Sequence, residues 1–376
     1  MKILLAPDKF KGSLTARQVS QAMANGIQRF DASIETVLHP MADGGEGSLE
    51  VLEQLLKPER ITLEVPDPLF RPVRASYLWK DQRAYVEMAQ ASGLELLAPA
   101  ERNCLYTTTL GTGSLMADAL DRGATELYLF IGGSATNDAG LGVARALGYR
   151  FLDEDNQEIE PIGKELVRLA AIDTSQLRYD FSQVKVYVVC DVQNVLYGPA
   201  GAAYVYGPQK GADAAALRVL DDGLRQVSRV VQADLGITLN NLAGGGAAGG
   251  VGAGAVAFLG AEILPGTDTL MQITQFYEQL AEVDLIMTGE GKLDEQTLHG
   301  KLVQGVVQAG RQRGIPVAAI CGTCTVDKAL LYEAGLRQVA EVLPRCKTLQ
   351  EAMTQAGPVV EELAYEIIKT FRSVGT

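Results

Sequence analysis

A short apolar run that passes into a polar, glycine-bearing loop and then into a helical pattern recurs along this chain. The clearest case is the run 127–130, which continues into the loop 131–140, Ile-Gly-Gly-Ser-Ala-Thr-Asn-Asp-Ala-Gly. Apolar runs at 2–7, 184–189 and 284–287 also end in polar loops. Strands that alternate with helices in this way are typical of a parallel sheet with helices on both faces. The sequence therefore predicts an α/β fold.

The alternation is clearest near the two ends of the chain, and 376 residues are too many for one ordinary core. Close to residue 61 the pattern changes, because three prolines (66, 68 and 72) precede short β-rich runs. We therefore predict two α/β domains. Residues 1–60 and 284–376 form a doubly wound parallel-sheet domain, and residues 61–283 form a second α/β domain inserted into it. Ligands of such sheets bind beyond the carboxyl ends of the strands.

Composition limits the partners that the chain is expected to bind. Acidic residues outnumber basic ones by 46 to 33, which gives a net charge of −13 and argues against nucleic acid and anionic membranes. Five cysteines spread over a long chain are typical of reduced thiols, so a cytoplasmic location is expected. The uncharged stretch 242–261 is long enough to span a bilayer, but it consists mostly of Gly and Ala. A glycine-rich loop that continues into a buried helix is the favoured interpretation.

The loop 131–140 has the composition of an anion seat. Paired glycines allow close backbone approach, and the N–H groups at the start of a helix favour negative charge. The alternative is a plain strand-to-helix turn without a ligand. Further polar loops with glycines and carboxylates follow other strands, and together they fit phosphoryl transfer, which needs donors around phosphate oxygens and Mg²⁺ to bridge them. Candidate donors are the backbone N–H groups of 132–134 and 244–246, and the candidate cations are Lys11, Lys210 and Lys301.

Carboxylates in the same loops are candidates for binding a metal or for accepting a hydroxyl proton: Asp43, Glu46, Asp191, Glu290 and Asp294. Asp191 follows an almost wholly apolar strand, so it is either a turn or capping residue or a base in the cleft. The two histidines have no paired spacing, which argues against zinc, and His39 is expected to be structural. The motifs GxxxxGK[ST], HRD, DFG and GxSxG are absent, and no GxGxxG follows the first strand.

Eight motifs, in order over nearly the whole chain, resemble those of the bacterial glycerate kinases. They are Ala6-Pro7-Asp8 with Lys11 and Ser13, Ala42-Asp43-Gly44-Gly45-Glu46-Gly47, the loop 132–138, Cys190-Asp191-Val192, Gly207-Pro208-Gln209-Lys210-Gly211, the loop 246–250, Thr288-Gly289-Glu290-Gly291 with Asp294, and His299-Gly300-Lys301.

The resemblance implies a discontinuous flavodoxin-like domain with an inserted α/β domain. It also implies transfer of the γ-phosphate of ATP to D-glycerate with Mg²⁺, usually at the 2-hydroxyl, while the residues themselves leave the 2- and 3-hydroxyl both open. Asp191 and Lys11 are the expected catalytic residues, and Glu290 and Asp294 the expected metal ligands. The residues expected to contact substrate or phosphate are Asp8, Ser13, Asp43, Gly44, Gly45, Glu46, Gly133, Ser134, Ala135, Asn137, Asp138, Gln209, Lys210, Glu290 and Lys301.

Two other classes of function remain open on the residues alone. A non-catalytic binder of small acidic metabolites would use the same interdomain cleft, although carboxylate-rich loops are unnecessary in a pure anion receptor. A nicotinamide-dependent oxidoreductase would need the dinucleotide fingerprint that the chain lacks. The expected partners are therefore D-glycerate and ATP, and a homodimer is a further possibility.

Overall fold

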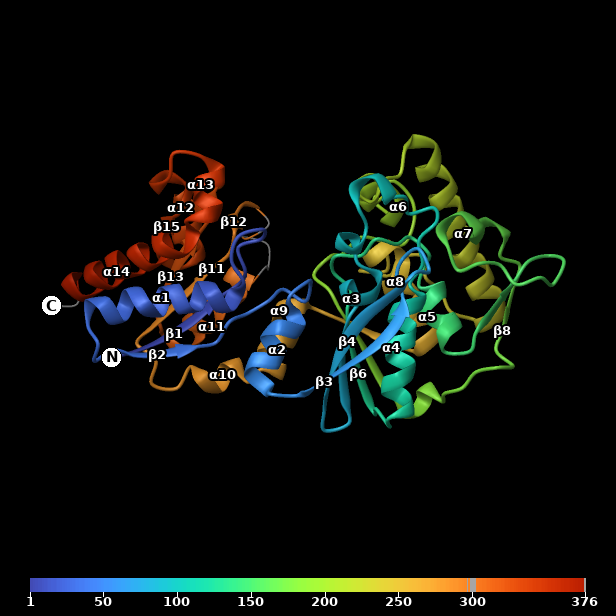
Figure 1. The fold of residues 1–376 in the computed structure, drawn as a ribbon, viewed down its shortest axis with the longest axis horizontal. Helices are drawn as coiled ribbons and strands as arrows, with labels where there is room; N and C mark the ends of the chain where they lie inside the picture. Colours follow the sequence, from blue (N-terminus) through green and yellow to red (C-terminus); the bar gives the residue numbers. More distant parts are fainter. Residues whose placement is uncertain (296, 298–301, 375–376) are drawn as a thin grey trace. The chain divides into compact units, whose positions relative to one another are not determined.

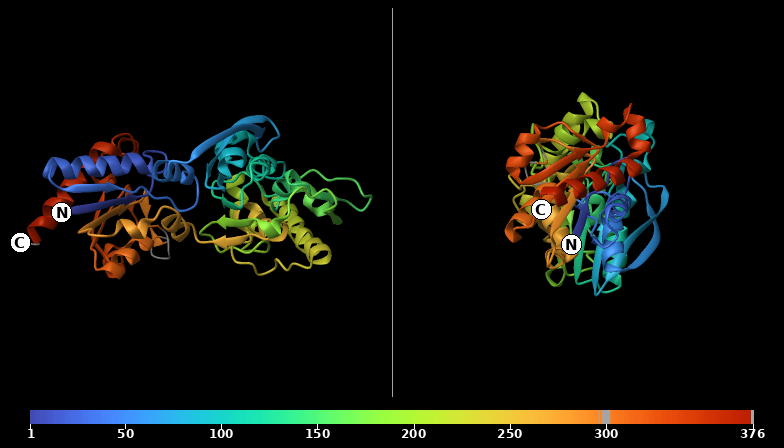
Figure 2. Two further views of the ribbon diagram at one scale, coloured as in Figure 1. Left: turned by 90° about the horizontal axis from the view of Figure 1, so that it is seen from below. Right: turned by 90° about the vertical axis from the view of Figure 1, so that its left-hand side faces the viewer.

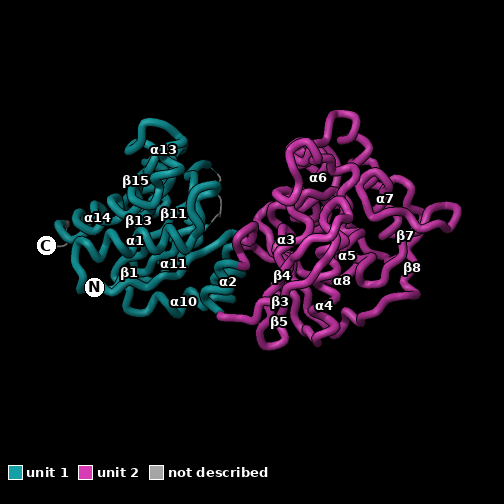
Figure 3. Tube along the Cα trace, viewed as in Figure 1, with its two compact units in different colours: residues 1–43, 50–56, 267–376 teal, residues 44–49, 57–266 magenta. Residues whose placement is uncertain are grey.

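The structure is a computed structural model that describes residues 1–295, 297 and 302–374. It is a mixed α/β protein with parallel sheets, and the chain divides into two compact units (Figure 3). Unit 1 comprises residues 1–43, 50–56 and 267–376, and unit 2 comprises residues 44–49 and 57–266. Figures 1 and 2 show that the beginning of the chain, in blue, and its last part, in orange and red, fold together in unit 1.

Unit 1 is built on a five-stranded sheet whose neighbouring strands are all parallel. The order of the strands across the sheet is β15-β13-β11-β1-β2. A separate two-stranded parallel sheet joins β12 to β14. The strands are β1 (Lys2–Pro7), β2 (Glu35–Leu38), β11 (Leu285–Gly289), β12 (Lys292–Leu293), β13 (Val317–Cys321), β14 (Thr323–Cys324) and β15 (Leu336–Glu341).

Alternate residues of a strand point to opposite faces of a sheet. Both faces of this sheet carry apolar side chains, and helices cover both. Ile3 and Leu5 pack with α1 and α14, whereas Leu4 and Ala6 pack in a second cluster that includes α11 (Figure 1). A capping box of Thr15 and Gln18 starts α1. The helices are α1 (Ala16–Phe30), α2 (Ser48–Leu56), α9 (Gly266–Ile273), α10 (Phe276–Gln279), α11 (Leu302–Arg313), α12 (Lys328–Ala334), α13 (Leu349–Thr354) and α14 (Ala356–Val374).

Unit 2 contains a six-stranded mixed sheet of order β10-β9-β6-β5-β4-β3. Strands β5, β6, β9 and β10 are parallel, and β3 and β4 join the edge as an antiparallel hairpin. Its strands are β3 (Glu59–Pro66), β4 (Pro72–Lys80), β5 (Arg83–Glu87), β6 (Glu126–Phe130), β9 (Lys185–Val189) and β10 (Glu262–Leu264). Its helices are α3 (Ala89–Ser92), α4 (Leu110–Asp121), α5 (Leu141–Ala146), α6 (Ala202–Tyr206), α7 (Ala214–Leu235) and α8 (Ala247–Leu259).

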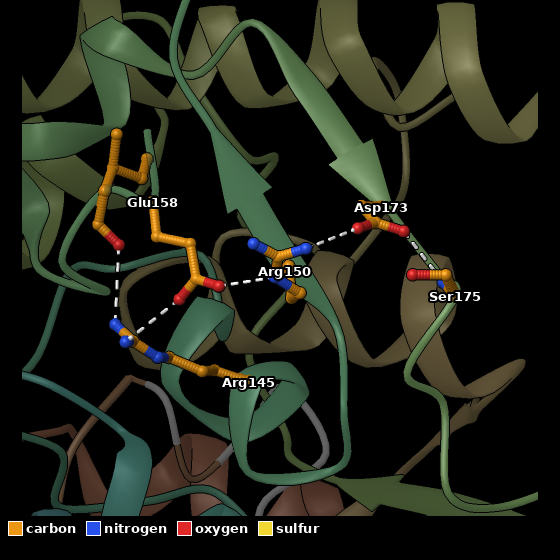
Figure 4. Close-up of polar contacts among 6 residues, drawn as sticks. Arg145, Arg150, Glu158, Asp173 and Ser175 are labelled. Carbon is orange, nitrogen blue, oxygen red and sulfur yellow. Dashed lines mark hydrogen bonds and ion pairs between the residues drawn. The ribbon is translucent and has the colours of Figure 1, made fainter. Parts of the chain in front are cut away.

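A small hairpin of β7 (Arg150–Leu152) and β8 (Ala171–Asp173) is tied down by charged side chains (Figure 4). Arg150 donates to Asp173 at 2.9 Å and also pairs with Glu158. Arg145 approaches Glu158 at 3.3 Å, and the Asp173 carboxylate accepts a hydrogen bond from the Ser175 N–H. These charges are fully matched within the network, so the hairpin is a structural feature.

The Gly/Ala stretch forms a buried helix, as its composition predicts. Helix α8 buries Val251, Phe258 and most of its glycines and alanines. Across the part of the chain that the structure describes, no helix combines the length and the apolar character that crossing a membrane requires.

Candidate active site

Four parallel strands of unit 2 end at one edge of its sheet, and most of the expected unit 2 site residues follow these ends. The loop 131–140 follows β6, Cys190 and Asp191 follow β9, and Gly266 lies two residues after β10. The carboxyl edge of this sheet is therefore the place where a ligand of unit 2 is expected.

Lys210 is the charged centre of this edge. Its side chain is 3% exposed, and its Nζ donates to Ser134 Oγ and to the Thr136 carbonyl, both at 2.7 Å. Burial lowers the pKa of Lys210 to about 8, while the nearby Cys104 and Asp138 act in the opposite direction. An ammonium group has three protons to donate, so one more acceptor can bind to it.

Other donors in the loop 131–140 also lack acceptors within the chain. The buried Asn137 Nδ2 and Thr136 Oγ1 have no hydrogen-bond partner among the described residues. No backbone carbonyl in the described part of the chain accepts from the N–H groups of Gly132, Gly133 and Ser134. Buried polar groups are normally paired, so the Asn137 and Thr136 side chains indicate a site that receives a ligand. The N–H of Gly133 is exposed and is open to the same ligand or to water.

The start of α5 differs from the sequence expectation. The N–H groups of Gly140 and Gly142 donate to the Asp138 carboxylate, which also accepts from the N–H and the hydroxyl of Thr109. The expectation of free amides at this helix start is therefore wrong, because a side chain of the loop itself occupies them. Burial raises the pKa of Asp138, and its four donors act in the opposite direction. The hydrogen bonds of Asp138 hold the loop 131–140 in its conformation.

The glycine-rich segment 244–250 supports the loop 131–140. The N–H groups of Gly245 and Gly246 donate to the carbonyls of Leu242 and Asn194, so two of the three expected donors at 244–246 are already used. Gly249 has φ +70°, and a Cβ on it would lie 2.1 Å from the Thr136 carbonyl oxygen. Only glycine permits this approach, because both the left-handed backbone and the contact exclude a side chain.

Residues 44–46 lie against the same loop. A Cβ on Gly132 would be 2.5 Å from Gly45 Cα, and a Cβ on Gly44 would be 2.9 Å from Gly266 Cα. The structure thus gathers these glycines and Glu46 close to the loop 131–140. Within unit 2 the sequence-predicted residues at or beside this edge are Gly44, Gly45, Glu46, Gly133, Ser134, Ala135, Asn137, Asp138, Asp191 and Lys210. Gln209 precedes Lys210 but is exposed.

Asp191 is fixed at the end of β9. Its Oδ1 accepts a hydrogen bond of 2.6 Å from the N–H of Gly266, the first residue of α9. The side chain is half-buried. The carboxylate is thus held in one orientation, which both of its expected roles, capping and base, require.

The remaining predicted residues lie in unit 1, at the carboxyl ends of β1, β2 and β11. Burial raises the pKa of Asp8 to about 8, and the negative charges of Asp43 and Glu290 act in the same direction. The loop after β1 approaches the loop after β11, since a Cβ on Gly291 would lie 3.3 Å from the Lys11 backbone nitrogen. Lys11 itself is exposed.

Other unit 1 residues are engaged by the chain. Ser13 Oγ donates to the Met353 carbonyl, Glu290 accepts from Thr297 Oγ1 at 2.6 Å, and Asp294 pairs with Lys292 at 3.3 Å. Lys301 lies outside the described residues. Within residues 1–295, 297 and 302–374, no three His, Cys, Asp or Glu side chains are grouped as a metal site.

His39 is structural, as expected. It is buried, and its Nε2 lies 3.0 Å from Thr274 Oγ1. Burial lowers the pKa of His39 to about 4.

Sequence reasoning did not single out two buried residues of the unit 2 edge. The hydroxyl of Thr136 is one of several polar groups that the loop 131–140 offers, and nothing in the pattern marks it as lacking a partner. Glu87 ends β5 and is 2% exposed. A carboxylate at the end of an apolar run is the signal that could have identified it, the same signal that drew attention to Asp191.

Parallel sheets with polar, glycine-bearing loops at their carboxyl ends define an α/β protein of the class that binds ligands at strand ends. Within that class the chain belongs to the glycerate kinase family, whose model matches residues 3–372. It is therefore an enzyme, a kinase.

Individual relatives agree with this assignment. The chain is 44% identical to a glycerate kinase of Halalkalibacterium halodurans over 97% of both chains. It is 39% identical to the glycerate 2-kinase of Escherichia coli over 95% of this chain and 94% of that protein. A crystal structure from Salmonella typhimurium LT2, named there as a candidate glycerate kinase 2, matches with a TM-score of 0.88 and 38% identity, covering 100% of this chain and 99% of that one.

Proposed function

We propose that this kinase transfers the γ-phosphate of ATP to D-glycerate, with Mg²⁺, and that the product is 2-phosphoglycerate. Support comes from the family and from the two relatives named glycerate kinase and glycerate 2-kinase, which match nearly the whole chain. A non-catalytic binder of acidic metabolites is not favoured, because these relatives are named as kinases.

The observation that carries the proposal is the seat around Lys210. A buried ammonium with one proton to spare lies beside the unpartnered amide of Asn137 and the backbone N–H groups of Gly132–Ser134. Phosphoryl transfer depends almost entirely on positioning and on stabilising negative charge, and these donors supply both. Both substrates are anions.

The roles of single residues follow from their chemistry. Lys210, Asn137 and Ser134 hold anionic oxygens of a substrate, and Asp138 keeps their loop in shape. Asp191 accepts the proton of the acceptor hydroxyl as the new O–P bond forms and the bond to ADP breaks. Lys11 is exposed, so it can move to an anionic substrate and neutralise phosphate charge.

The carboxylates of unit 1 fit Mg²⁺ by their chemistry. Mg²⁺ is usually held by one or two carboxylates, with phosphates and water as its other ligands, so a complete protein cage is not required. Burial, and after it the neighbouring negative charges, raise the pKa of Asp8, and a bound cation would relieve both effects. Glu290 and Asp294 would hold the ion. When bound, Mg²⁺ supplies charge neutralisation on the phosphates.

We further propose that unit 1 is a flavodoxin-like domain. The strand order β2-β1-β11-β13-β15, counted along the unit as 2-1-3-4-5, supports this. The predicted domains, 1–60 with 284–376 and 61–283, are proposed to correspond to the two compact units, whose limits are residues 43/44, 49/50, 56/57 and 266/267. The cytoplasmic location and the homodimer stay predictions.

The experiment that tests the proposal compares Asp191→Asn with the wild type. Asparagine keeps an oxygen that can accept from Gly266 and loses the base, so most of kcat should disappear while KM for ATP changes little. Asp155→Asn, in an exposed turn, is the matched control and should behave as wild type. Normal turnover of Asp191→Asn would remove this residue from the chemistry. ATP-independent binding of glycerate without turnover by the wild type would favour the non-catalytic alternative.

A further inference from the structure

Glu87 holds the start of a helix that it does not belong to. Its Oε2 accepts a hydrogen bond of 3.1 Å from the N–H of Leu49, in the first turn of α2. The carboxylate is 2% exposed, at the carboxyl end of β5, and 38 residues away in sequence. A carboxylate at a helix start interacts favourably with the free N–H groups and with the helix dipole.

A local cap for α2 would have been simpler, since Ser48 is its first residue. The Ser48 hydroxyl, however, donates to the Gly45 carbonyl at 2.6 Å, and the Ser48 N–H points to the same carbonyl at 3.3 Å. Serine therefore ties the preceding loop to the helix, and the capping contact comes from the distant strand. Together these bonds fix residues 45–49 to the sheet.

The same short segment touches the anion seat. A Cβ placed on Gly132 would lie 2.5 Å from Gly45 Cα, so these two residues are in close contact. Gly132 is at the start of the loop that continues to Ser134. Glu87 also pairs in register with Phe130, two residues before Gly132. A contiguous path of bonds and contacts thus leads from the Glu87 carboxylate through Leu49, Ser48 and Gly45 to the loop that Lys210 binds.

Chain crossings between the two units coincide with this anchoring. The chain passes from one unit to the other at 43/44 and 49/50, on either side of the anchored segment. The last crossing, at 266/267, begins at Gly266, whose N–H donates to Asp191 at the end of β9. Carboxylates at two strand ends of one sheet therefore fix the segments by which the chain leaves unit 2.

We propose that Glu87 is a positioning residue of the kinase reaction, which acts through residues 44–49 on the loop that forms the anion seat. It does not need to touch the substrate. If the segment is released, Gly45 and Glu46 lose their fixed approach to Gly132, and the seat loses its shape. Misplacement by about 1 Å can cost on the order of a hundredfold in rate.

The test uses two variants of Glu87 in the full chain. Glu87→Gln retains an oxygen that can accept from Leu49, whereas Glu87→Met fills the space without an acceptor. We expect Glu87→Gln to stay within about threefold of wild-type kcat/KM and Glu87→Met to lose about tenfold to a hundredfold. Glu126→Gln, at the opposite end of β6 in the same sheet, is the matched control and should leave the kinetics unchanged.

A second readout separates positioning from mere stability. Amide hydrogen exchange in Glu87→Met should accelerate in residues 44–49 and 131–138, while the other strands of unit 2 keep wild-type protection. Native exchange in residues 44–49, or faster exchange there with wild-type kcat and KM, would overturn the proposal. The kinetic arm rests on the proposed function. If the wild type does not phosphorylate glycerate that function fails, and loss of protection in both segments would still establish the coupling.

Discussion

Replacing Lys210 by methionine separates a binding role of this lysine from a structural one. The ordinary lysine pKa of 10.5 falls to about 8 in the folded chain. At about 1.4 kcal/mol for each pH unit, burying the charge costs the fold about 3 kcal/mol at neutral pH. The methionine variant removes this cost. It also leaves the Thr136 carbonyl and the Ser134 hydroxyl without their partner, which costs about 1–3 kcal/mol for each of the two groups.

The two terms oppose each other, so the change in the free energy of unfolding at pH 7 should lie between a gain of about 1 kcal/mol and a loss of about 3 kcal/mol. Activity should respond differently. A hydrogen bond from a charged group to a substrate oxygen contributes about 1.5–3 kcal/mol, so kcat/KM should fall by about tenfold to more than a hundredfold. A residue that binds substrate at the expense of the fold shows this combination of results.

Urea denaturation and steady-state kinetics measure the two quantities. Lys164→Met, in the same unit but with a half-exposed side chain, is the control and should change neither by much. The pH dependence adds a sign test. Because the unfolded chain binds the proton of Lys210 more tightly, wild-type stability should rise relative to the variant from pH 8 to 10.5. If Lys210→Met lowers the free energy of unfolding by more than about 4 kcal/mol and leaves kcat/KM unchanged, the reasoning is refuted. Lys210 would then stabilise the fold and would not bind substrate.

Three further predictions concern the support of the site and the fold. Gly249→Ala should destabilise the chain by about 2–4 kcal/mol and lower kcat/KM, since its Cβ would meet Thr136. Gly260→Ala, also left-handed but with open space around it, should cost only about 1–2 kcal/mol and spare activity, and equal effects in denaturation would contradict this contrast. Protonating buried His39, whose folded pKa of about 4 lies below its ordinary 6.5, should remove about 3 kcal/mol of stability as the pH falls from 6.5 to 4. His39→Gln should abolish that slope in acid denaturation, and an unchanged slope would exclude His39 as its source. Asp138→Asn should lower the free energy of unfolding by about 1–3 kcal/mol, because the amide NH₂ of asparagine faces groups that are themselves donors. An unaltered Tm in thermal unfolding would contradict this.

Elements that carry their own hydrophobic pattern were predictable from the sequence. The runs 127–130 and 184–189 correspond to β6 and β9, and the uncharged stretch to buried α8. Periodicity reports local structure well when a strand is apolar throughout and ends in a polar loop. By contrast, β3 (Glu59–Pro66) alternates exposed and buried residues beside prolines, and it was not assigned as a strand.

The sequence predicted which types of residue form the site, but it did not predict which of them hydrogen-bond to one another. Ser134 and Lys210 were both candidates, yet nothing in the spacing of residues 76 apart shows that one donates to the other. Glycines 245 and 246 looked like phosphate donors because composition does not reveal that carbonyls elsewhere in the chain accept from their amides. Hydrogen bonds between residues far apart in the sequence are therefore the part of the site that the sequence alone does not predict.

A ³¹P spectrum of the reaction of purified wild-type protein with ATP, Mg²⁺ and D-glycerate tests the central claim most directly. The account predicts one new phosphomonoester signal, that of 2-phosphoglycerate, growing in step with ADP, and its near absence with Lys210→Met under the same conditions. Release of inorganic phosphate alone, or no consumption of ATP by the folded wild type, would contradict it.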